Sequence, residues 1–390
     1  MASWPTARRC AFLWWSAPTW MTVGELLMVL LLVQLQPGSA VLKENDPCKF
    51  NGSPGVCRQY ATCRKELENK TPIICTHSFH GAIVCCPEGL ENRIVSPASE
   101  RTAVRKCNEY RKLSYDEVTA IGLSLVSVVA RSEVPTCDSI TKLIVGGNIT
   151  NPGEFPHMAA IGWRQADKSV SFNCGGSLIS DRFVLTAAHC NKDVNRVWPS
   201  FVRLGDQNLF REDDRARPKD YTIAEFINHP QFVRRQGQYN DIALIKLDRS
   251  VAFSRFIRPA CLYDREAIPS KKAIATGFGA LGFAEDPSNE LMKVSLKIYD
   301  NKLCTDAFAK HRSVPRGVLP SQLCAGNVEG GMDTCQGDSG GPLQITDQGN
   351  HCVFYVFGIT SIGQGCGAQV PAIYTRVASF LSWIEPIVWG

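Results

Sequence analysis

The most informative run of residues in this 390-residue chain is Gly337-Asp338-Ser339-Gly340-Gly341-Pro342. A serine hydroxyl is a poor nucleophile at neutral pH, so it needs a neighbouring base to take its proton. Glycines on both sides of Ser339 allow the backbone to turn tightly and to point N–H groups at a developing oxyanion. The run therefore predicts a nucleophile loop, in which the amides of Gly337 and Ser339 form the oxyanion hole.

Two motifs upstream supply the groups that such a serine needs. They are Thr186-Ala187-Ala188-His189-Cys190 and Asn240-Asp241-Ile242-Ala243-Leu244. An imidazole titrates in the right range to act as the base, and a buried carboxylate fixes its tautomer. Taken singly, the histidine could be a core residue, the aspartate a turn residue and the glycine-rich run a plain turn. Together, in the order His189, Asp241, Ser339, they predict a catalytic triad.

The sequence around these motifs predicts an all-β domain over residues 144–390. Short apolar runs such as Phe183–Leu185 and Val353–Ile359 alternate with glycine, proline and aspartate. That rhythm is typical of an antiparallel sandwich or barrel. The exception is the C-terminus, where Val377, Phe380, Leu381, Ile384 and Val388 recur at helical spacing despite Pro386. A closing amphipathic helix is expected there.

Composition narrows the class of protein and its compartment. The chain is 44% hydrophobic and 20% charged, which is typical of a folded protein, and a net charge of +5 gives no indication of nucleic-acid binding. It contains 17 cysteines, a number that favours an oxidising compartment where disulfides persist.

The first forty residues predict an export signal. Arg8 and Arg9 precede the apolar run Leu26–Val33, and Pro37-Gly38-Ser39-Ala40 suits a cut after Ala40. The run is shorter than a membrane-spanning helix requires, so an uncleaved signal anchor is only the alternative. Translation could also begin at Met21. Removing residues 1–40 takes Cys10 away and leaves 16 of the 17 cysteines, an even number. A secreted, fully disulfide-bonded chain is expected.

Residues 48–86 form a small cysteine-rich module. The segment is too short to bury much of a core, so cross-links are expected to stabilise it. Zinc is the competing explanation, but no Cys-x2-Cys pair is present and the export signal favours disulfides. Spacing alone leaves 15 connectivities open. The six residues are Cys48, Cys57, Cys63, Cys75, Cys85 and Cys86.

A polar stretch, residues 87–143, connects this module to the β-rich region. It has little patterning and two lone cysteines, Cys107 and Cys137, which is typical of a linker or a functional segment. The apolar run Leu123–Ala130 could pack on a neighbouring domain, but simple burial is the favoured interpretation.

Residues 144–390 resemble a chymotrypsin-fold serine protease, a family in which the triad has this His, Asp, Ser order. The resemblance implies a double Greek-key β-barrel with a C-terminal helix. It also implies the family's mechanism, in which the serine attacks and the histidine acts as the base. It also implies the bridges Cys174–Cys190, Cys304–Cys324 and Cys335–Cys366. A further pair that many relatives carry falls on Ala273 and Ile345, so both of its members are missing together.

The resemblance implies trypsin-like specificity. Asp333, six residues before Ser339, matches the floor of the specificity pocket, where a buried carboxylate demands a cationic Arg or Lys side chain. Gly363 and Ala372 match the pocket walls. Ala372 replaces the usual glycine and leaves the ranking of Arg and Lys open, and Ile362 replaces a usual tryptophan.

The same resemblance implies a zymogen. Ile144-Val145-Gly146-Gly147 matches the amino terminus that cleavage creates, and the freed ammonium of Ile144 would pair with Asp338. Leu143 precedes the cut, so we expect activation by an upstream protease with an apolar pocket rather than self-activation. Cys137–Cys261 would match the family's inter-chain bridge, which leaves Cys107 to pair with Cys352.

The cysteine spacing of residues 48–86 resembles the clip domain of arthropod proteases, which implies the pairs Cys48–Cys85, Cys57–Cys75 and Cys63–Cys86. The whole chain resembles clip-domain serine proteases, nearest the snake and persephone type. The resemblance implies an extracellular cascade in Toll signalling, melanisation or dorsoventral patterning, a clip-protease zymogen as substrate and a serpin as inhibitor. A non-catalytic homologue that acts as a binding cofactor is the alternative, and a digestive protease is disfavoured.

Two surface features complete the expectations. Asn51, Asn69 and Asn148 lie in glycosylation sequons. The chemistry requires no cofactor, but an acidic cluster lies where some relatives bind structural Ca²⁺. Interleaved arginines, Arg211, Arg215 and Arg217, favour a solvated loop instead. The cluster consists of Asp206, Glu212, Asp213 and Asp214.

Overall fold

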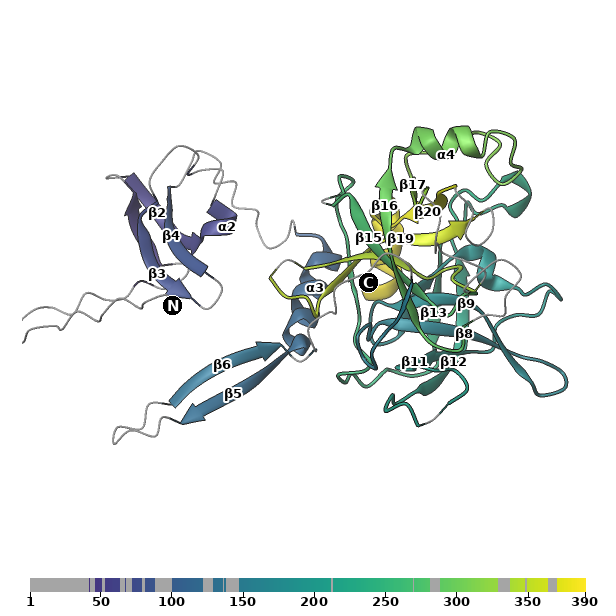
Figure 1. Cartoon of the computed structure of the whole chain (residues 1–390), viewed down its shortest axis with the longest axis horizontal. Helices are drawn as coiled ribbons and strands as arrows, with labels where there is room; N and C mark the ends of the chain where they lie inside the picture. Colours follow the sequence, from purple (N-terminus) through teal and green to yellow (C-terminus); the bar gives the residue numbers. More distant parts are fainter. Residues whose placement is uncertain are drawn as a thin grey trace, which may run out of the picture. The chain divides into compact units, whose positions relative to one another are not determined.

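The chain divides into two compact units, residues 1–94 and 95–390, and each is described by itself (Figure 1). In the computed structural model, the described residues are 42, 46–50, 53–63, 67, 72–78, 81–87, 100–121, 129–135, 137, 147–211, 213–268, 270–280, 288–328, 337–347, 349–363 and 370–390. Several predicted features lie outside them: the export signal, Asn51, Asn69, Leu143, Ile144, Glu212, Asp333 and the pair Cys335–Cys366.

The first unit is a small sheet closed by cross-links. Its strands β1 (Pro47–Phe50), β2 (Ser53–Gln59), β3 (Ile74–Ser78) and β4 (Gly81–Pro87) run in the order β1-β2-β4-β3, beside the short helix α2 (Tyr60–Cys63). Phe50, Leu67 and Val84 pack against the cystines and supply a small core. The three expected bridges, Cys48–Cys85, Cys57–Cys75 and Cys63–Cys86, are confirmed.

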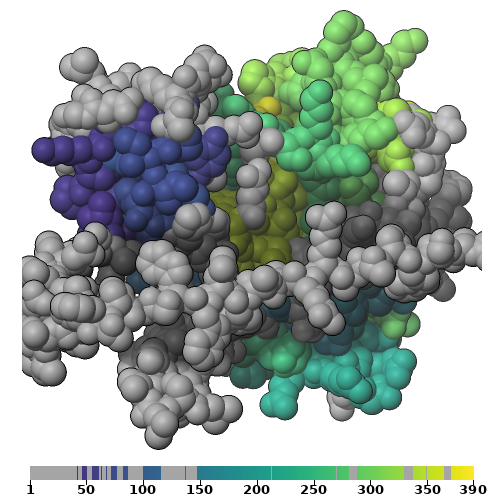
Figure 2. Space-filling view, turned by 60° about the vertical axis from the view of Figure 1, so that its left-hand side comes forward, coloured from purple at the N-terminus to yellow at the C-terminus, as the bar shows by residue number. Residues whose placement is uncertain are grey.

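The second unit contains two β-barrels, which are its teal lobe and its green to yellow lobe in Figure 2. The first barrel closes in the order β10-β13-β12-β11-β8-β9. Its strands are β8 (Met158–Arg164), β9 (Val170–Leu178), β10 (Phe183–Thr186), β11 (Phe201–Leu204), β12 (Lys219–Asn228) and β13 (Ala243–Leu247). Their aliphatic side chains fill the centre of the barrel.

The second barrel closes where β19 pairs with β20. The strands of this sheet are β14 (Cys261–Leu262), β15 (Lys272–Gly277), β16 (Met292–Tyr299), β17 (Gln322–Gly326), β18 (Pro342–Thr346), β19 (Phe354–Ile362) and β20 (Ala372–Arg376), and the short β7 (Asn148–Ile149) pairs with β16. Two helices follow or interrupt them, α4 (Asn301–Ala307) and α5 (Leu381–Trp389). The expected all-β double barrel with a C-terminal helix is confirmed.

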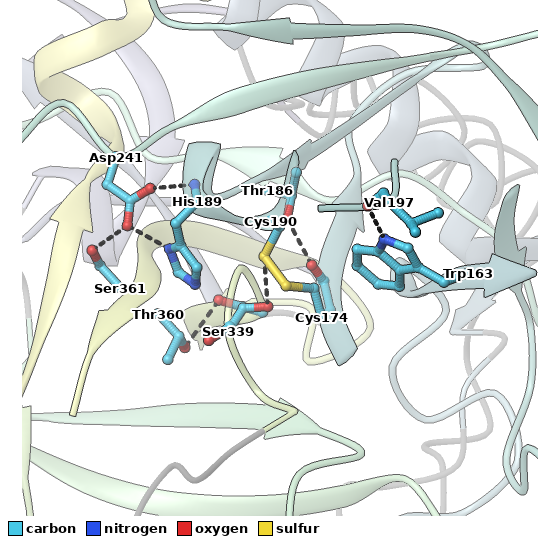
Figure 3. The surroundings of a disulfide bond; sticks show 12 residues. Trp163, Cys174, Thr186, His189, Cys190, Val197, Asp241, Ser339, Thr360 and Ser361 are labelled. Atoms are coloured by element: carbon cyan, nitrogen blue, oxygen red, sulfur yellow. Dashed lines mark hydrogen bonds and ion pairs between the residues drawn. A yellow bond between two sulfur atoms is a disulfide. The ribbon is translucent and has the colours of Figure 1, made fainter. Parts of the chain in front are cut away.

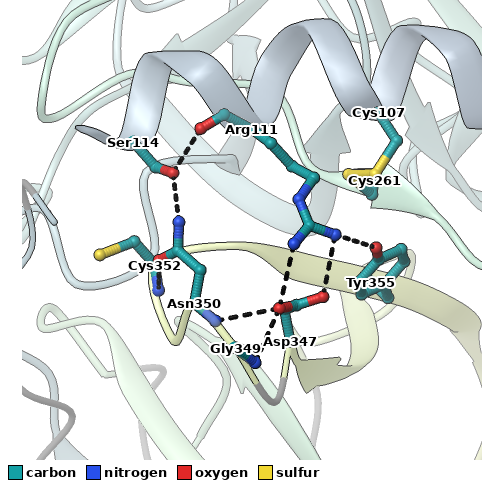
Figure 4. Close-up of polar contacts among 9 residues, drawn as sticks. All are labelled: Cys107, Arg111, Ser114, Cys261, Asp347, Gly349, Asn350, Cys352 and Tyr355. Atoms are coloured by element: carbon teal, nitrogen blue, oxygen red, sulfur yellow. Dashed lines mark hydrogen bonds and ion pairs between the residues drawn. A yellow bond between two sulfur atoms is a disulfide. The ribbon is translucent and has the colours of Figure 1, made fainter. Parts of the chain in front are cut away.

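Part of the segment 87–143 belongs structurally to the second unit. Helix α3 (Thr102–Arg111) and the one-turn η3 (Lys112–Ser114) pack on the second barrel, and a hairpin of β5 (Tyr115–Ile121) and β6 (Val129–Pro135) follows. Arg111 lies 3.1 Å from a carboxylate oxygen of Asp347, and Asn350 donates to Ser114 Oγ at 2.7 Å (Figure 4). Several polar contacts and a buried cystine therefore hold α3 in place.

The two bridges between this segment and the barrel correct our expectation. The structure pairs Cys107 with Cys261 and Cys137 with Cys352, so the predicted Cys137–Cys261 and Cys107–Cys352 pairs are wrong. The reason is helix α3, which places Cys107 with its Cα 4.9 Å from that of Cys261 and buries it against Val353. Residue 137 follows the hairpin and meets Cys352 instead.

Among the described residues, no helix has the length and apolar character needed to cross a membrane.

Candidate active site

His189 and Asp241 come together at one end of the first barrel. His189 lies in the 3-10 turn η4 (Ala188–Asn191) directly after β10, and Asp241 lies two residues before β13. Because β10 pairs with β13, the ends of the two strands are neighbours. Nδ1 of His189 lies 2.7 Å from Oδ2 of Asp241, and its backbone N–H donates to Oδ1 at 2.9 Å (Figure 3).

The carboxylate of Asp241 is fully buried but surrounded by hydrogen-bond donors. Burial by itself raises the pKa of Asp241, but the charge and hydrogen bonds of His189 together with the hydroxyl of Ser361 lower it below its usual value. Ser361 Oγ donates to Oδ2 at 2.5 Å. Asp241 therefore remains ionised and can orient the imidazole and stabilise its protonated form.

Ser339 lies in the loop before β18, and this loop packs against the histidine turn. Its carbonyl accepts a hydrogen bond from Gly175 N at 2.8 Å, and Gly340 has a positive φ of 77°. A Cβ at Gly340 would lie 2.2 Å from Thr186 Oγ1, so only glycine permits this approach. The bridge Cys174–Cys190 is present beside it, and the imidazole of His189 lies between Asp241 and Ser339 in Figure 3.

The other expected site residues are placed as follows. Gly337 has a φ of 100° in the turn before Ser339, Gly363 is exposed just after β19, and Ala372 is buried at the start of β20. Ile362 is buried against Ile373. Cys304–Cys324 is present as expected.

Asp338 lies against two glycines that the sequence analysis did not single out. Gly279 N donates to Asp338 Oδ1 at 2.9 Å. A Cβ at Gly277 would lie 2.0 Å from the same oxygen, and one at Gly279 would lie 2.4 Å from Oδ2. Ser361 was also missed, because nothing near it in the sequence marks it as a partner of Asp241. The run Gly277-Phe278-Gly279 was the available signal for a close approach.

Among the described residues, we compared a cysteine–histidine group and the acidic loop as candidate metal ligands. The group Cys174, His189 and Cys190 has suitable spacing, but both cysteines are in a disulfide. In the acidic loop, Asp206 lies 3.5 Å from Arg203 and Asp213 lies 2.9 Å from Arg211. Burial raises the pKa of Asp206 to about 6. Arginines thus accompany two of the acidic side chains, of which Asp213 is exposed and Asp206 is buried.

Comparison with known proteins agrees with this geometry. The family model described as Trypsin matches residues 144–384. Serine protease snk of Drosophila melanogaster is 38% identical over 350 residues, which cover 87% of this chain and 77% of that protein. Venom serine protease Bi-VSP of Bombus ignitus is 34% identical over 383 residues, covering 93% and 98%.

The name of a third relative includes the N-terminal module. CLIP domain-containing serine protease B4 of Anopheles gambiae is 34% identical over 300 residues, covering 73% of this chain and 81% of that protein. The triad geometry, the double barrel and the cross-linked N-terminal sheet fit these relatives. The chain therefore belongs to the trypsin family of serine endopeptidases, as a clip-domain protease similar to the snake type.

Proposed function

We propose that this chain is a secreted zymogen that is cut between Leu143 and Ile144 and then cleaves a downstream protease zymogen after Arg or Lys. The observation that carries the proposal is the intact His189–Asp241 pair beside Ser339, because a binding homologue would have no need to retain it. The cascade would be extracellular, in immunity, melanisation or embryonic patterning.

The chemistry follows from the placement of the triad. Ser339 Oγ attacks the substrate carbonyl carbon while His189 Nε2 takes the hydroxyl proton. The amides of Gly337 and Ser339 stabilise the resulting oxyanion. His189 then gives the proton to the leaving amine, which breaks the C–N bond and leaves an acyl-enzyme. Water, deprotonated by His189, hydrolyses that ester and restores Ser339. No cofactor takes part in these steps, and we assign no Ca²⁺ to the acidic loop.

Strand pairing supports the activation switch. Ile149 in β7 pairs with Met292 in β16, and Met292 pairs with Gly277 in β15, which touches the Asp338 carboxylate. Ile149 and Gly277 are therefore two strand spacings apart, which is about 10 Å. The four residues before Asn148 have a reach of about 13 Å. The ammonium of a freed Ile144 can therefore reach Asp338, which adjoins the nucleophile.

We infer the substrate specificity and the protein partners from sequence positions that match those of the family. Asp333 would bind the Arg or Lys side chain between walls formed by Gly363 and Ala372. Leu143 before the cut calls for an activating protease with an apolar pocket, and a serpin would be the natural inhibitor. Secretion rests on the signal at residues 1–40 and on the disulfides.

The test is a zymogen in which Leu143 is replaced by a recognition site for a chosen protease. After verified cleavage before Ile144, hydrolysis of arginyl, lysyl and phenylalanyl amides is compared with the uncut protein and with Ser339→Ala. We expect activity only after cleavage, only on Arg or Lys, and lost in Asp333→Ser. No hydrolysis of any of the three would instead favour the binding-cofactor alternative.

A further inference from the structure

A buried ion pair holds the segment that follows the activation site. Nζ of Lys293 in β16 lies 2.5 Å from Oε1 of Glu154, and their side chains are only 3% and 5% exposed. The other carboxylate oxygen accepts a hydrogen bond from Asn151 N at 2.9 Å. The pair therefore joins the turn at residues 151–154 to the second barrel.

Lys293 contacts the same segment a second time through its backbone. It pairs with Asn148 in β7, and the next residues continue the attachment because Thr150 N donates to Leu291 O at 2.9 Å. Thr150 Oγ1 also donates to Gln207 Oε1 at 2.9 Å, inside the protein. Residues 148–154 are thus held at both ends.

The position of Lys293 links the anchored segment, residues 148–154, to the pocket around Asp338. Its neighbour Met292 pairs with both Ile149 and Gly277, and Gly277 touches the Asp338 carboxylate. Strand β16 therefore lies between the anchored segment and Asp338. Only residues 145–147 separate Ile144 from the held segment, residues 148–154.

Because both charges of the pair are buried, the anchored segment is held in one position. Moving Glu154 away from Lys293 would leave two charges inside the protein without partners, which is far more costly than breaking an exposed pair. An apolar contact would tolerate a small shift of the segment, whereas an ion pair with this burial does not.

We propose that Glu154 and Lys293 are a positioning pair for activation, which fixes residues 148–154 so that the new amino terminus at Ile144 enters the Asp338 pocket. The inference rests on the proposed activation by cleavage before Ile144. The pair is already formed in the uncut chain, so cleavage releases a short arm from a prepared anchor. Without the pair, a larger fraction of cut molecules would leave Ile144 outside the pocket.

The experiment measures the exposure of the Ile144 amine directly. Zymogens carrying the engineered cleavage site are cut, treated with an acetylating reagent for a fixed time, and analysed by mass spectrometry for acetylation of the Ile144 α-amine. The variants are Lys293→Met and the double change Glu154→Gln with Lys293→Met. The control is Lys302→Met, which removes a lysine from the exposed Lys302–Asp306 pair.

We expect slow acetylation in the wild type and in the control, and at least tenfold faster acetylation in Lys293→Met. The double variant leaves no buried charge without a partner and is expected to fold. It therefore tests the role of the pair even if Lys293→Met does not fold. It should still be acetylated several-fold faster than wild type. On amide substrates both variants should lose kcat, and added free Ile-Val dipeptide should restore part of it.

Wild-type rates of acetylation in the folded double variant would overturn the proposal. So would a wild-type Ile144 amine that reacts as fast as it does in the urea-unfolded protein. A protected amine without amide hydrolysis would count against the proposed protease activity alone, and the comparison of acetylation rates would still decide the role of the pair.

Discussion

Ser361 donates its hydroxyl proton to Oδ2 of Asp241 at 2.5 Å, and the same oxygen lies 2.7 Å from Nδ1 of His189. One carboxylate oxygen is therefore shared between the triad histidine and a serine from β19 of the second barrel. Thr375 of β20 adds a hydrogen bond to the backbone carbonyl of Asp241 at 2.8 Å. The acid of the triad comes from the first barrel, but the second barrel fixes its position.

Replacing Ser361 by alanine should therefore impair catalysis without unfolding the protein. A hydrogen bond to a charged group contributes about 1.5–3 kcal/mol, which corresponds to a loss of about 10- to 100-fold. We expect this loss mainly in kcat of the activated enzyme. Ser169→Ala, which removes a 2.6 Å hydrogen bond to the exposed Asp167, should leave kcat unchanged. An unaltered kcat in Ser361→Ala would mean that His189 alone positions the carboxylate.

Replacing Gly277 by alanine should block activation at a step after cleavage. The added methyl group would lie 2.0 Å from Asp338 Oδ1, so the carboxylate must move away from its pocket. We expect normal cutting before Ile144 but at least a tenfold lower kcat/KM on arginyl amides. Gly349→Ala is the control, because its methyl group would lie no closer than 3.3 Å to its neighbours. Full activity of the cut Gly277→Ala enzyme would show that Asp338 has no role in activation.

Two independent bridges should keep the cut chains together. The pairs Cys107–Cys261 and Cys137–Cys352 both join residues before the activation site to the barrel. Changing either pair to serines should leave a single band on a non-reducing gel after cleavage, while changing both should release the N-terminal chain. Peptide mapping without reduction should recover the Cys107–Cys261 peptide. Recovery of Cys137 with Cys261 would contradict the pairing.

His157 should make the protein sensitive to acid. Burial lowers the pKa of His157 to about 3, against a smaller opposing effect of Gln344. An unfolded histidine has a pKa of about 6.5, so between these values the unfolded chain binds the extra proton and stability falls as the pH falls. The slope from this one group is about 1.4 kcal/mol per pH unit.

Denaturant titrations at several pH values between 4 and 7 measure that slope. His157→Phe should show a shallower loss of unfolding free energy on acidification than the wild type. Phe155→Leu changes the same aromatic cluster without removing a titratable group, so it should lower stability equally at each pH. Equal slopes in wild type and His157→Phe would contradict the buried, neutral histidine.

The triad could be recognised in the sequence, because its signals are local. The glycines around Ser339 and the histidine before Cys190 are such signals, since each depends on short-range backbone geometry. The spacing of the six clip cysteines left 15 pairings open, and the three bridges in the structure are those that the resemblance to clip domains implies.

The tertiary structure decided the rest, because the partners come from distant parts of the chain. Ser361 meets Asp241 across 120 residues, and Lys293 meets Glu154 across 139. The choice between Cys261 and Cys352 as the partner of Cys107 depended on the docking of helix α3, whose polar sequence carries no sign of it. Spacing reports which residues are near one another along the backbone, whereas the closure of two barrels determines which distant side chains share a buried charge or a bond.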